Sequence, residues 1–276
     1  MKIYYRNHVG QTVDLMEWPY RISGSDLFDY GWKYENRSSL NPKITRFYHD
    51  IVEKSVEICI SARNLTTYNQ AMMNLLEVTE KDVLSLKPGR LYVDDTFLSC
   101  YFISSKKANW HPGVTFLTNG FTVVSESGKW IREVKTSYIA GGQSSSDDSY
   151  MDYAYDYAYD YSSSSGWAAF DNPGYAPADF EMTIHGPCEN PEVLIAGHSY
   201  SVACELLAGE YLRIDSMNRK VYKVRVNGEQ VNQFGMRNRE SSVFEKIPVG
   251  NCGIAWDGSF SVDIVLYEER SEPRWT

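Results

Sequence analysis

The chain has 276 residues and a formal net charge of −9, with 43% hydrophobic and 14% aromatic residues. This length can hold one large all-β domain or two ordinary domains, and the apolar content excludes a wholly disordered chain. No apolar run approaches the roughly 20 residues that span a bilayer, so we expect no membrane insertion. The first residues lack the apolar stretch of a secretory signal. An acidic chain is also a poor general ligand for nucleic-acid phosphates.

The first 140 residues predict an α+β domain with one helix. Apolar and β-branched runs indicate strands at Lys54–Ser61, Arg90–Val93, Phe97–Ile103 and Gly120–Val124. A helical stripe indicates a helix from about Thr66 to Asp82, with Thr66 or Thr67 as its N-cap. The apolar helix residues that we expect in the core are Ala71, Met72, Met73, Leu75, Leu76 and Val78.

The acidity of the chain lies in one segment. Residues 136–212 hold 12 acids and no lysine or arginine, whereas the rest of the chain carries +3. Inside this segment, a Gly/Ser-rich stretch leads into a tetrapeptide repeat of tyrosine, alanine and aspartate at residues 153–161, and four serines follow. Such a composition shift marks an insertion or arm between two domains.

The Tyr/Asp repeat has a period of two. On a strand, this period gives one aromatic face and one small, acidic face, so we interpret the repeat as a β-arm that pairs with a sheet edge or a neighbouring subunit. A disordered low-complexity insertion explains the same composition. A calcium loop fits less well because the EF-hand pattern is absent. The predicted interaction residues are Tyr153, Tyr155, Tyr157, Tyr159, Tyr161, Asp152, Asp156 and Asp160.

The last hundred residues predict an all-β domain. Apolar and polar residues alternate in Ser201–Leu206, Val221–Val226 and Ser261–Leu266, as expected for strands with one buried face. The faces that we expect to be buried are Val202, Cys204 and Leu206, then Tyr222, Val224 and Val226, then Val262, Ile264 and Leu266. Asn227-Gly228 predicts a hairpin turn. Short strands without a helix indicate a β-sandwich of jelly-roll type.

The sequence has few candidates for catalytic or metal-binding residues. Five cysteines without a CxxC pair predict neither a disulfide framework nor a zinc site, and we interpret them as buried free thiols of a chain folded in a reducing cytoplasm. No metalloprotease, serine-hydrolase or phosphate-loop motif occurs. We interpret His185 as a structural histidine, and most of the seven tryptophans as core or rim residues. We therefore predict no catalytic residue, no metal ligand and no cofactor, and we expect that the chain is not an enzyme.

Several short segments occur along the chain in the same order as similar segments of a known protein family. The segments are Asp26–Tyr34, Ile44–Tyr48, Met73–Leu76, Lys81–Val83, Pro88–Tyr92, Phe121–Val124, Trp130–Glu133, Thr183–Pro191, Glu210–Asp215, Phe244–Gly250 and Trp275. Together they resemble the distal tail protein of siphovirus-type, long-tailed bacteriophages. The resemblance covers nearly the whole chain except about 141–178.

This resemblance implies a mainly β chain with one helix. It implies an N-terminal α+β, split-barrel-like, ring-forming domain at 1–140 and a galectin-like β-sandwich (jelly roll) at 179–276, with the insertion at 141–178 between them. It further implies a homohexameric ring in the virion, at the phage tail tip, made in the host bacterial cytoplasm. The expected partners are the tail tube protein, the tip hub protein and peripheral receptor-binding or side-fibre proteins.

In this arrangement the genome passes through the channel of the ring without specific recognition. Two other functions remain open from the sequence. One is a carbohydrate-binding β-sandwich module that attaches the virion to the host surface. The other is a hydrolase that assembles carboxylates from distant strands.

Overall fold

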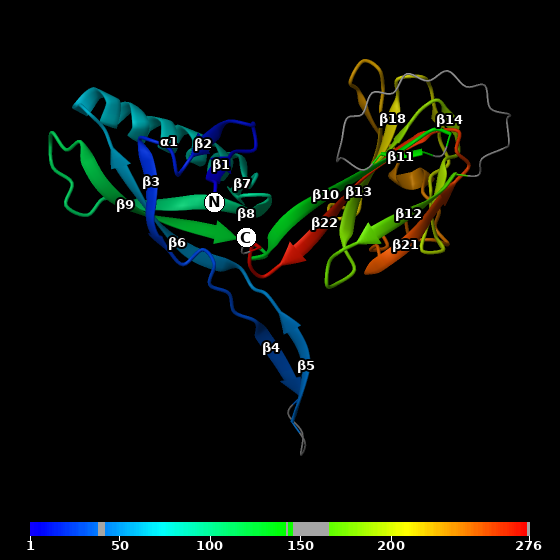
Figure 1. The fold of residues 1–276 in the computed structure, drawn as a ribbon, viewed down its shortest axis with the longest axis horizontal. Coiled ribbons are helices and arrows are strands. Elements are labelled where there is room, and N and C mark those ends of the chain that lie inside the picture. The colour runs from blue at the N-terminus through cyan, green and yellow to red at the C-terminus, as the bar shows by residue number, and fades with distance from the viewer. Residues whose placement is uncertain (38–41, 142, 146–165, 275–276) are drawn as a thin grey trace. The chain divides into compact units, whose positions relative to one another are not determined.

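The computed structural model describes residues 1–37, 42–141, 143–145 and 166–274. The chain divides into two compact units, Met1–Arg132 with Arg270–Thr276, and Glu133–Glu269. Antiparallel strands dominate both units, and α1 (Leu65–Ser85) is the single α-helix of the described residues (Figure 1). The predicted fold class, mainly β with one helix, is confirmed.

The first unit is a split barrel of two sheets that share one strand. The first sheet has the order β2-β1-β7-β8, and the second has the order β3-β6-β9-β8. The strands are β1 (Ile3–Arg6), β2 (Thr12–Asp14), β3 (Tyr20–Ser25), β6 (Val52–Ser61), β7 (Gly89–Val93), β8 (Thr96–Lys106) and β9 (Phe116–Ser125). The first half of β8 pairs with β7 and its second half pairs with β9, with a register shift between Phe102 and Ser104. The four strands predicted for this part of the chain lie within β6, β7, β8 and β9 and are confirmed.

A separate two-stranded hairpin extends from this unit between β3 and β6. It consists of β4 (Lys33–Arg37) and β5 (Lys43–Tyr48), which pair only with each other among the described strands. Figure 1 shows it pointing away from the side of the unit that carries α1.

Helix α1 packs against β6 and β8. It buries Tyr68, Ala71, Leu75 and Val78, which gives the helix one core-facing stripe. It lacks the combination of length and apolar character that a membrane crossing requires, and it is the only helix of that length in the described part of the chain.

Two expectations about α1 are wrong. The N-cap is Asn64, whose side-chain oxygen accepts a hydrogen bond from the backbone N–H of Thr67 at 2.8 Å, because Thr66 and Thr67 already lie in the first helical turn. Met73 and Leu76 are not core residues: they are 64% and 47% exposed. The sheets cover only one side of the helix, and these two residues lie on its other side.

A buried polar cluster ties α1 to the first sheet. The hydroxyl of Tyr5 on β1 donates to Oδ2 of Asp82 on α1 at 2.5 Å. The other carboxylate oxygen accepts the backbone N–H of His8 at 2.9 Å and lies 2.5 Å from His8 Nδ1. Gly89 borders this cluster, where any Cβ would overlap the Tyr5 hydroxyl and the Asp82 carboxylate. The packing therefore requires glycine at this position.

The second unit is a β-sandwich. One sheet has the order β11-β10-β22-β13-β18-β19-β20, with β10 continuing into this unit from Glu133 on, and the other has the order β12-β21-β15-β16. The strands of the first sheet are β10 (Trp130–Ile139), β11 (Gln143–Ser145), β13 (Asp179–His185), β18 (Tyr211–Asp215), β19 (Lys220–Val224), β20 (Gln230–Asn232) and β22 (Ser261–Arg270). The strands of the second are β12 (Gly166–Asn172), β15 (Glu192–Ile195), β16 (His198–Ser201) and β21 (Gly250–Trp256). Two short strands, β14 (Cys188–Glu189) and β17 (Glu205–Leu206), and the 3-10 turn η1 (Phe234–Met236) complete it.

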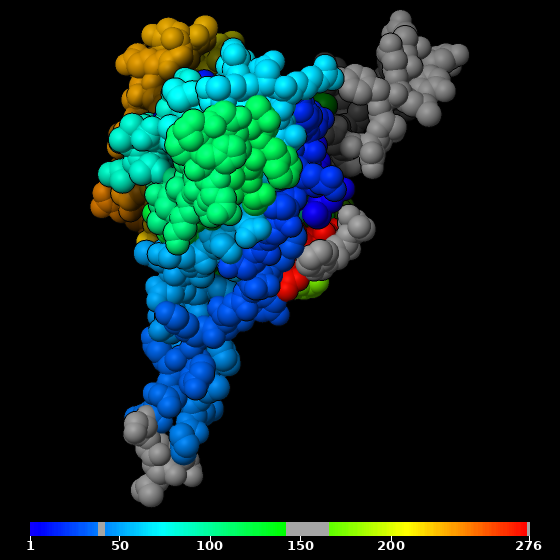
Figure 2. Space-filling model, turned by 90° about the vertical axis from the view of Figure 1, so that its left-hand side faces the viewer, coloured from blue at the N-terminus to red at the C-terminus, as the bar shows by residue number. Residues whose placement is uncertain are grey.

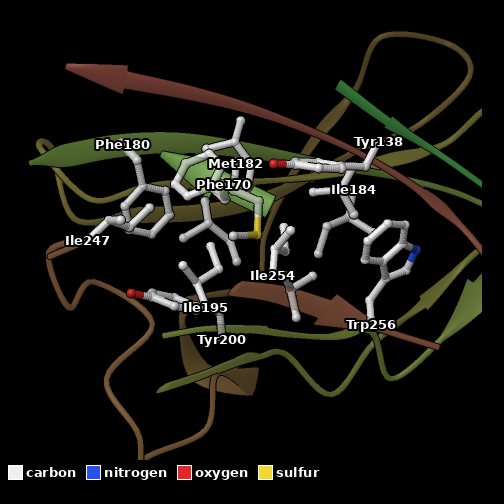
Figure 3. Packing of buried hydrophobic residues seen from close by; sticks show 14 of the residues in the cluster. Tyr138, Phe170, Phe180, Met182, Ile184, Ile195, Tyr200, Ile247, Ile254 and Trp256 are labelled. Atoms are coloured by element: carbon white, nitrogen blue, oxygen red, sulfur yellow. The ribbon is translucent and has the colours of Figure 1, made fainter. Parts of the chain in front are cut away.

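The core of the sandwich lies between the two sheets (Figure 3). Its labelled members are Tyr138, Phe170, Phe180, Met182, Ile184, Ile195, Tyr200, Ile247, Ile254 and Trp256. The polar atoms of the buried aromatic residues find backbone partners: the hydroxyl of Tyr200 donates to the carbonyl of Glu245 at 2.9 Å, and the indole of Trp256 to that of Phe260 at 2.9 Å.

Two C-terminal predictions are confirmed. Ser261–Leu266 lies in β22, with its alternate apolar residues buried. Asn227-Gly228 forms the turn between β19 and β20, and Gly228 has the positive φ of +82° that this turn favours.

Two other strand predictions are only partly correct. Ser201–Leu206 is not one strand, because β16 ends at Ser201, Val202 forms an isolated bridge with Arg237, and β17 begins at Glu205; Cys204 is only half-buried. The strand predicted at Val221–Val226 ends at Val224. Val226 is drawn into the hairpin turn and is 75% exposed.

Candidate interaction surface

The hairpin β4–β5 is amphipathic across its two faces. Tyr34 lies directly opposite Phe47, and after a register shift Asn36 lies opposite Ile44, so one face carries two aromatic residues and an isoleucine. The other face carries the charged residues Lys33, Glu35, Arg37, Lys43 and Arg46 together with Tyr48. Tyr34, Ile44 and Phe47 are 59%, 46% and 57% exposed, so the apolar face is open to solvent.

An exposed ion pair and a ring–ring contact lie at the base of the hairpin. Lys33 Nζ lies 2.8 Å from Oδ2 of Asp50, and the indole of Trp32 packs on the ring of His49 with centroids 4.0 Å apart. The hydrogen bond from Lys33 holds the pKa of the Asp50 carboxyl below its usual range, and the same bond raises the pKa of Lys33. These contacts lie at the base of the hairpin, and its apolar face stays exposed.

An isolated two-stranded hairpin is marginally stable in water. Native proteins rarely expose contiguous apolar surface unless it binds something. The hairpin is therefore the strongest candidate for an interaction surface among the described residues. Its sequence signal is weak: Lys33–Arg37 alternates, but nothing local shows that the second strand leaves the sheets.

The predicted interaction residues of the acidic arm lie outside the described residues. These are Tyr153, Tyr155, Tyr157, Tyr159, Tyr161, Asp152, Asp156 and Asp160. The described strands on either side of them belong to the second unit: β11 pairs with β10, and β12 pairs with β21. Both flanks of the repeat are thus held in the sandwich.

The described tryptophans differ in burial. Trp130 and Trp256 are buried, as predicted. Trp18, Trp32, Trp110 and Trp167 are 49–70% exposed, so these four are not core residues, and their interpretation as rim residues stays a prediction.

Two polar clusters of the described residues join neighbouring elements of the fold. His185 Nε2 lies 2.7 Å from Oδ2 of Asp263 on the neighbouring strand, and the interpretation of this histidine as structural stays a prediction. Within the described ranges, no group of three or more histidine, cysteine, aspartate or glutamate side chains is placed to hold a metal ion. The cluster of Tyr5, His8 and Asp82 joins β1 to α1, and burial raises the pKa of Tyr5.

The cysteines are free thiols with different degrees of burial. Cys100 and Cys252 are buried, whereas Cys59, Cys188 and Cys204 are partly exposed, so the expectation of burial is correct for two of the five. Burial raises the pKa of Cys188 to about 11 and raises that of Cys100 further. These two thiols stay protonated at neutral pH, and a protonated thiol is a poor nucleophile.

Comparison with known proteins identifies the fold. No protein-family model matches the sequence, and no curated protein matches it. Among solved structures, the chain is similar to the Dit protein (gp 19.1) of phage SPP1, with a TM-score of 0.62, 11% identity and 98% of each chain covered. It is also similar to a chain of the phage P2 baseplate in its activated conformation, with calcium and with strontium, at a TM-score of 0.64, 11% identity and 99% of both chains covered. The resemblance to phage distal tail proteins is therefore confirmed at the level of the fold, and the match to Dit extends over the residues of both units.

Proposed function

We propose that this protein is a structural component of a bacteriophage tail tip. In the proposed role, six copies form a ring that joins the tail tube to the tip hub and carries peripheral adsorption proteins. The observation that supports this proposal most strongly is the match over 98% of both chains to SPP1 Dit, a protein described as a paradigm of the hub adsorption apparatus of phages that infect Gram-positive bacteria.

The surface of the first unit supports self-assembly. A cyclic ring needs two different complementary patches on each subunit, one for each neighbour. An exposed amphipathic hairpin is such a patch. The number six comes from the family resemblance.

The proposed partners are the tail tube protein, the tip hub protein and receptor-binding or side-fibre proteins. The chain would be made in the cytoplasm of the host bacterium and would reside in the virion, at the tail tip. Outside residues 136–212 the sequence carries only +3, so the ring would let the genome pass without specific recognition. The role is mechanical and involves no catalytic chemistry.

Two measurements test this proposal. Native mass analysis of the purified full chain is expected to show a species of six times the 31.6 kDa chain mass. Antibody labelling of the phage that encodes it is expected to mark one end of the tail, at the tip. Absence of the protein from purified virions would refute the proposal.

The tyrosine-rich repeat has a proposed part in assembly. Tyrosine side chains on one face and small or acidic ones on the other suit addition of a strand to a neighbouring edge. Deletion of residues 150–161 is expected to leave both units folded, by circular dichroism and thermal unfolding, and to lower the yield of complete tail tips. Complete tails of normal infectivity would show that the repeat is dispensable.

A second candidate function, carbohydrate binding, rests on a hollow in the sandwich. The hollow has a volume of about 440 Å³ and is lined by Asp215, Arg219, Lys220, Val221, Tyr222, Gln230, Asn232 and Phe234. Amides and aromatic rings suit a sugar ligand, but the ring of Phe234 is already flanked by Arg237 and Phe244. A glycan array with the full chain, compared with Tyr222→Ala, tests this function; signal that the variant retains would exclude this hollow.

A further inference from the structure

A polar hollow lies on the first unit where the end of β1, the turn after it and the start of β7 meet. Its volume is about 440 Å³, and it is lined by Arg6, Asn7, His8, Val9, Gly10, Pro88, Arg90 and Tyr92. Figure 2 shows residues from the N-terminal end of the chain, in dark blue, at the surface beside α1, in cyan. A volume of this size is in the range of sites for small molecules.

Two arginines stand directly opposite each other at this hollow. Arg6 on β1 pairs in register with Arg90 on β7, so both guanidinium groups leave the same face of the sheet. The same row continues to Thr12 on β2 and to Ser99 on β8, which are both neutral. Arg90 also lies over the ring of Phe97, 4.2 Å from its centroid. Like charges directly opposite each other destabilise a sheet, and an anion bound between them would offset this cost.

The turn that follows Arg6 is held by the side chain of Asn7, which is buried. Its Nδ2 donates to Oε1 of Gln11 at 2.9 Å and to the carbonyl of Val78 on α1 at 3.2 Å. Its Oδ1 accepts the backbone N–H groups of Val9 at 3.2 Å and of Gln11 at 2.8 Å. The amide therefore makes the four hydrogen bonds that it can make, and the turn that carries His8 is fixed to the sheet and the helix.

The ring of His8 is oriented by the carboxylate of Asp82, which is fully buried. Nδ1 of the ring lies 2.5 Å from Oδ1 of Asp82, and the backbone N–H of His8 donates to the same oxygen at 2.9 Å. A carboxylate behind a histidine fixes the orientation of the ring and the role of each nitrogen. Because Nδ1 is engaged in this way, Nε2 is the ring nitrogen that His8 offers to a ligand in the hollow that it lines.

We infer that this hollow binds a phosphate group, either as free phosphate or as the phosphate of a small phosphorylated molecule. The guanidinium groups of Arg6 and Arg90 hold the phosphate oxygens, and Nε2 of His8 donates a third contact. This site goes beyond the proposed ring function and does not depend on it.

The number of donors and the charge both favour phosphate over a carboxylate. A carboxylate has two oxygens, which one arginine already satisfies in a bidentate pair, whereas a terminal phosphate has three acceptor oxygens. Here the donors come from three positions, on β1, on β7 and on the turn. With His8 protonated, three cations and the Asp82 carboxylate leave two positive charges, which balance the two negative charges of a phosphate dianion. None of the described lining residues is an acid that would repel it.

Calorimetric titration of the purified full chain tests the site. The probes are inorganic phosphate, phenyl phosphate, acetate and a short DNA oligonucleotide without terminal phosphates, all at the same ionic strength. The test variant is Arg6→Gln, and Arg6→Lys keeps the charge but loses the planar fork of donors. The matched control is Arg21→Gln, an exposed arginine on β3 of the same unit. Protection of Arg6 from phenylglyoxal by phosphate, measured by peptide mass analysis, gives a readout on the unaltered chain.

Inorganic phosphate and phenyl phosphate are expected to bind at least about tenfold more weakly to Arg6→Gln, because a hydrogen bond to a charged group is lost. Arg6→Lys is expected to lose less, Arg21→Gln less than about twofold, and phosphate is expected to protect Arg6. If the oligonucleotide binds more tightly than the small phosphates and this binding also depends on Arg6, the phosphate comes from a nucleic-acid backbone and the site stands.

Three results would overturn the inference. Absence of binding at millimolar phosphate, together with an unprotected Arg6, would mean that the hollow is not an anion site. Equal affinity of the wild type and Arg6→Gln would place the bound phosphate elsewhere on the protein. Tighter binding of acetate than of phosphate would show that the ligand class is wrong. The native mass of the chain is a separate measurement, so each of these failures leaves the proposed ring function standing.

Discussion

In β22 of the sandwich, Val262, Ile264 and Leu266 alternate with other residues and are no more than 1% exposed. In the hairpin, Tyr34 and Phe47 stand in the same kind of alternation and are 59% and 57% exposed. The local pattern is the same, but the second sheet that covers it is present in one region and absent in the other. This difference in burial indicates that the apolar face of the hairpin is suited to a partner outside its own chain.

The largest expected effect on the free energy of unfolding comes from truncating a large side chain in the core of the sandwich. Phe180 is fully buried and packs edge-to-face on Tyr200, with ring centroids 5.2 Å apart. Phe180→Ala is expected to lower the free energy of unfolding by about 3–5 kcal/mol, through lost transfer energy and a residual cavity. Urea unfolding followed by tryptophan fluorescence measures it. Trp167→Ala, an exposed aromatic residue in the same unit, is the control, and a cost no larger than that of the control would contradict the assignment of the core.

A smaller effect is expected from the buried cluster of the first unit. Tyr5→Phe removes the hydroxyl that donates to the Asp82 carboxylate, and hydrogen bonds to charged groups contribute about 1.5–3 kcal/mol. The matched control is Tyr20→Phe, which loses a bond to the backbone carbonyl of Ala71 and is expected to cost about 0.5–1.5 kcal/mol. If both variants lost the same free energy of unfolding in the same urea assay, the hydrogen bond to Asp82 would be no stronger than the bond to the backbone carbonyl.

The helix cap gives a still smaller effect. Asn64→Ala removes the side-chain acceptor for the Thr67 N–H and is expected to cost about 1 kcal/mol. Thr66→Ala serves as the control, because this residue lies inside the first turn and should change stability by less than about 0.5 kcal/mol. If Thr66→Ala were the more costly of the two, the helix would begin later than the structure places it.

Features that depend on local periodicity could be predicted from the sequence. The strands β6, β7, β8, β9 and β22 and the turn at Asn227-Gly228 follow from alternation and turn chemistry over a few residues. The order of such segments was also enough to predict the Dit-like fold at 11% identity.

Features that depend on distant packing could not be predicted. The helix has apolar residues on two sides, and only the position of the sheets decides that Leu75 is buried while Met73 and Leu76 are exposed. The exposed face of the hairpin has the same origin, since no local signal shows that β4 and β5 leave the barrel. The exposed face of the hairpin and the exposed side of the helix therefore follow only from the structure.

The smallest effect on stability is expected from a substitution on the exposed apolar face of the hairpin. Phe47→Ser changes a side chain that is 57% exposed among the described residues, so the free energy of unfolding of the dilute monomer should change by no more than about 0.5 kcal/mol. Self-association at high concentration should nevertheless fall, measured by sedimentation velocity, while Arg37→Ser on the charged face should alter it less. A monomer destabilised by more than about 2 kcal/mol would mean that Phe47 is packed within its own chain as core residues are. The hairpin would then be a small satellite core, and the contrast with the sandwich would disappear.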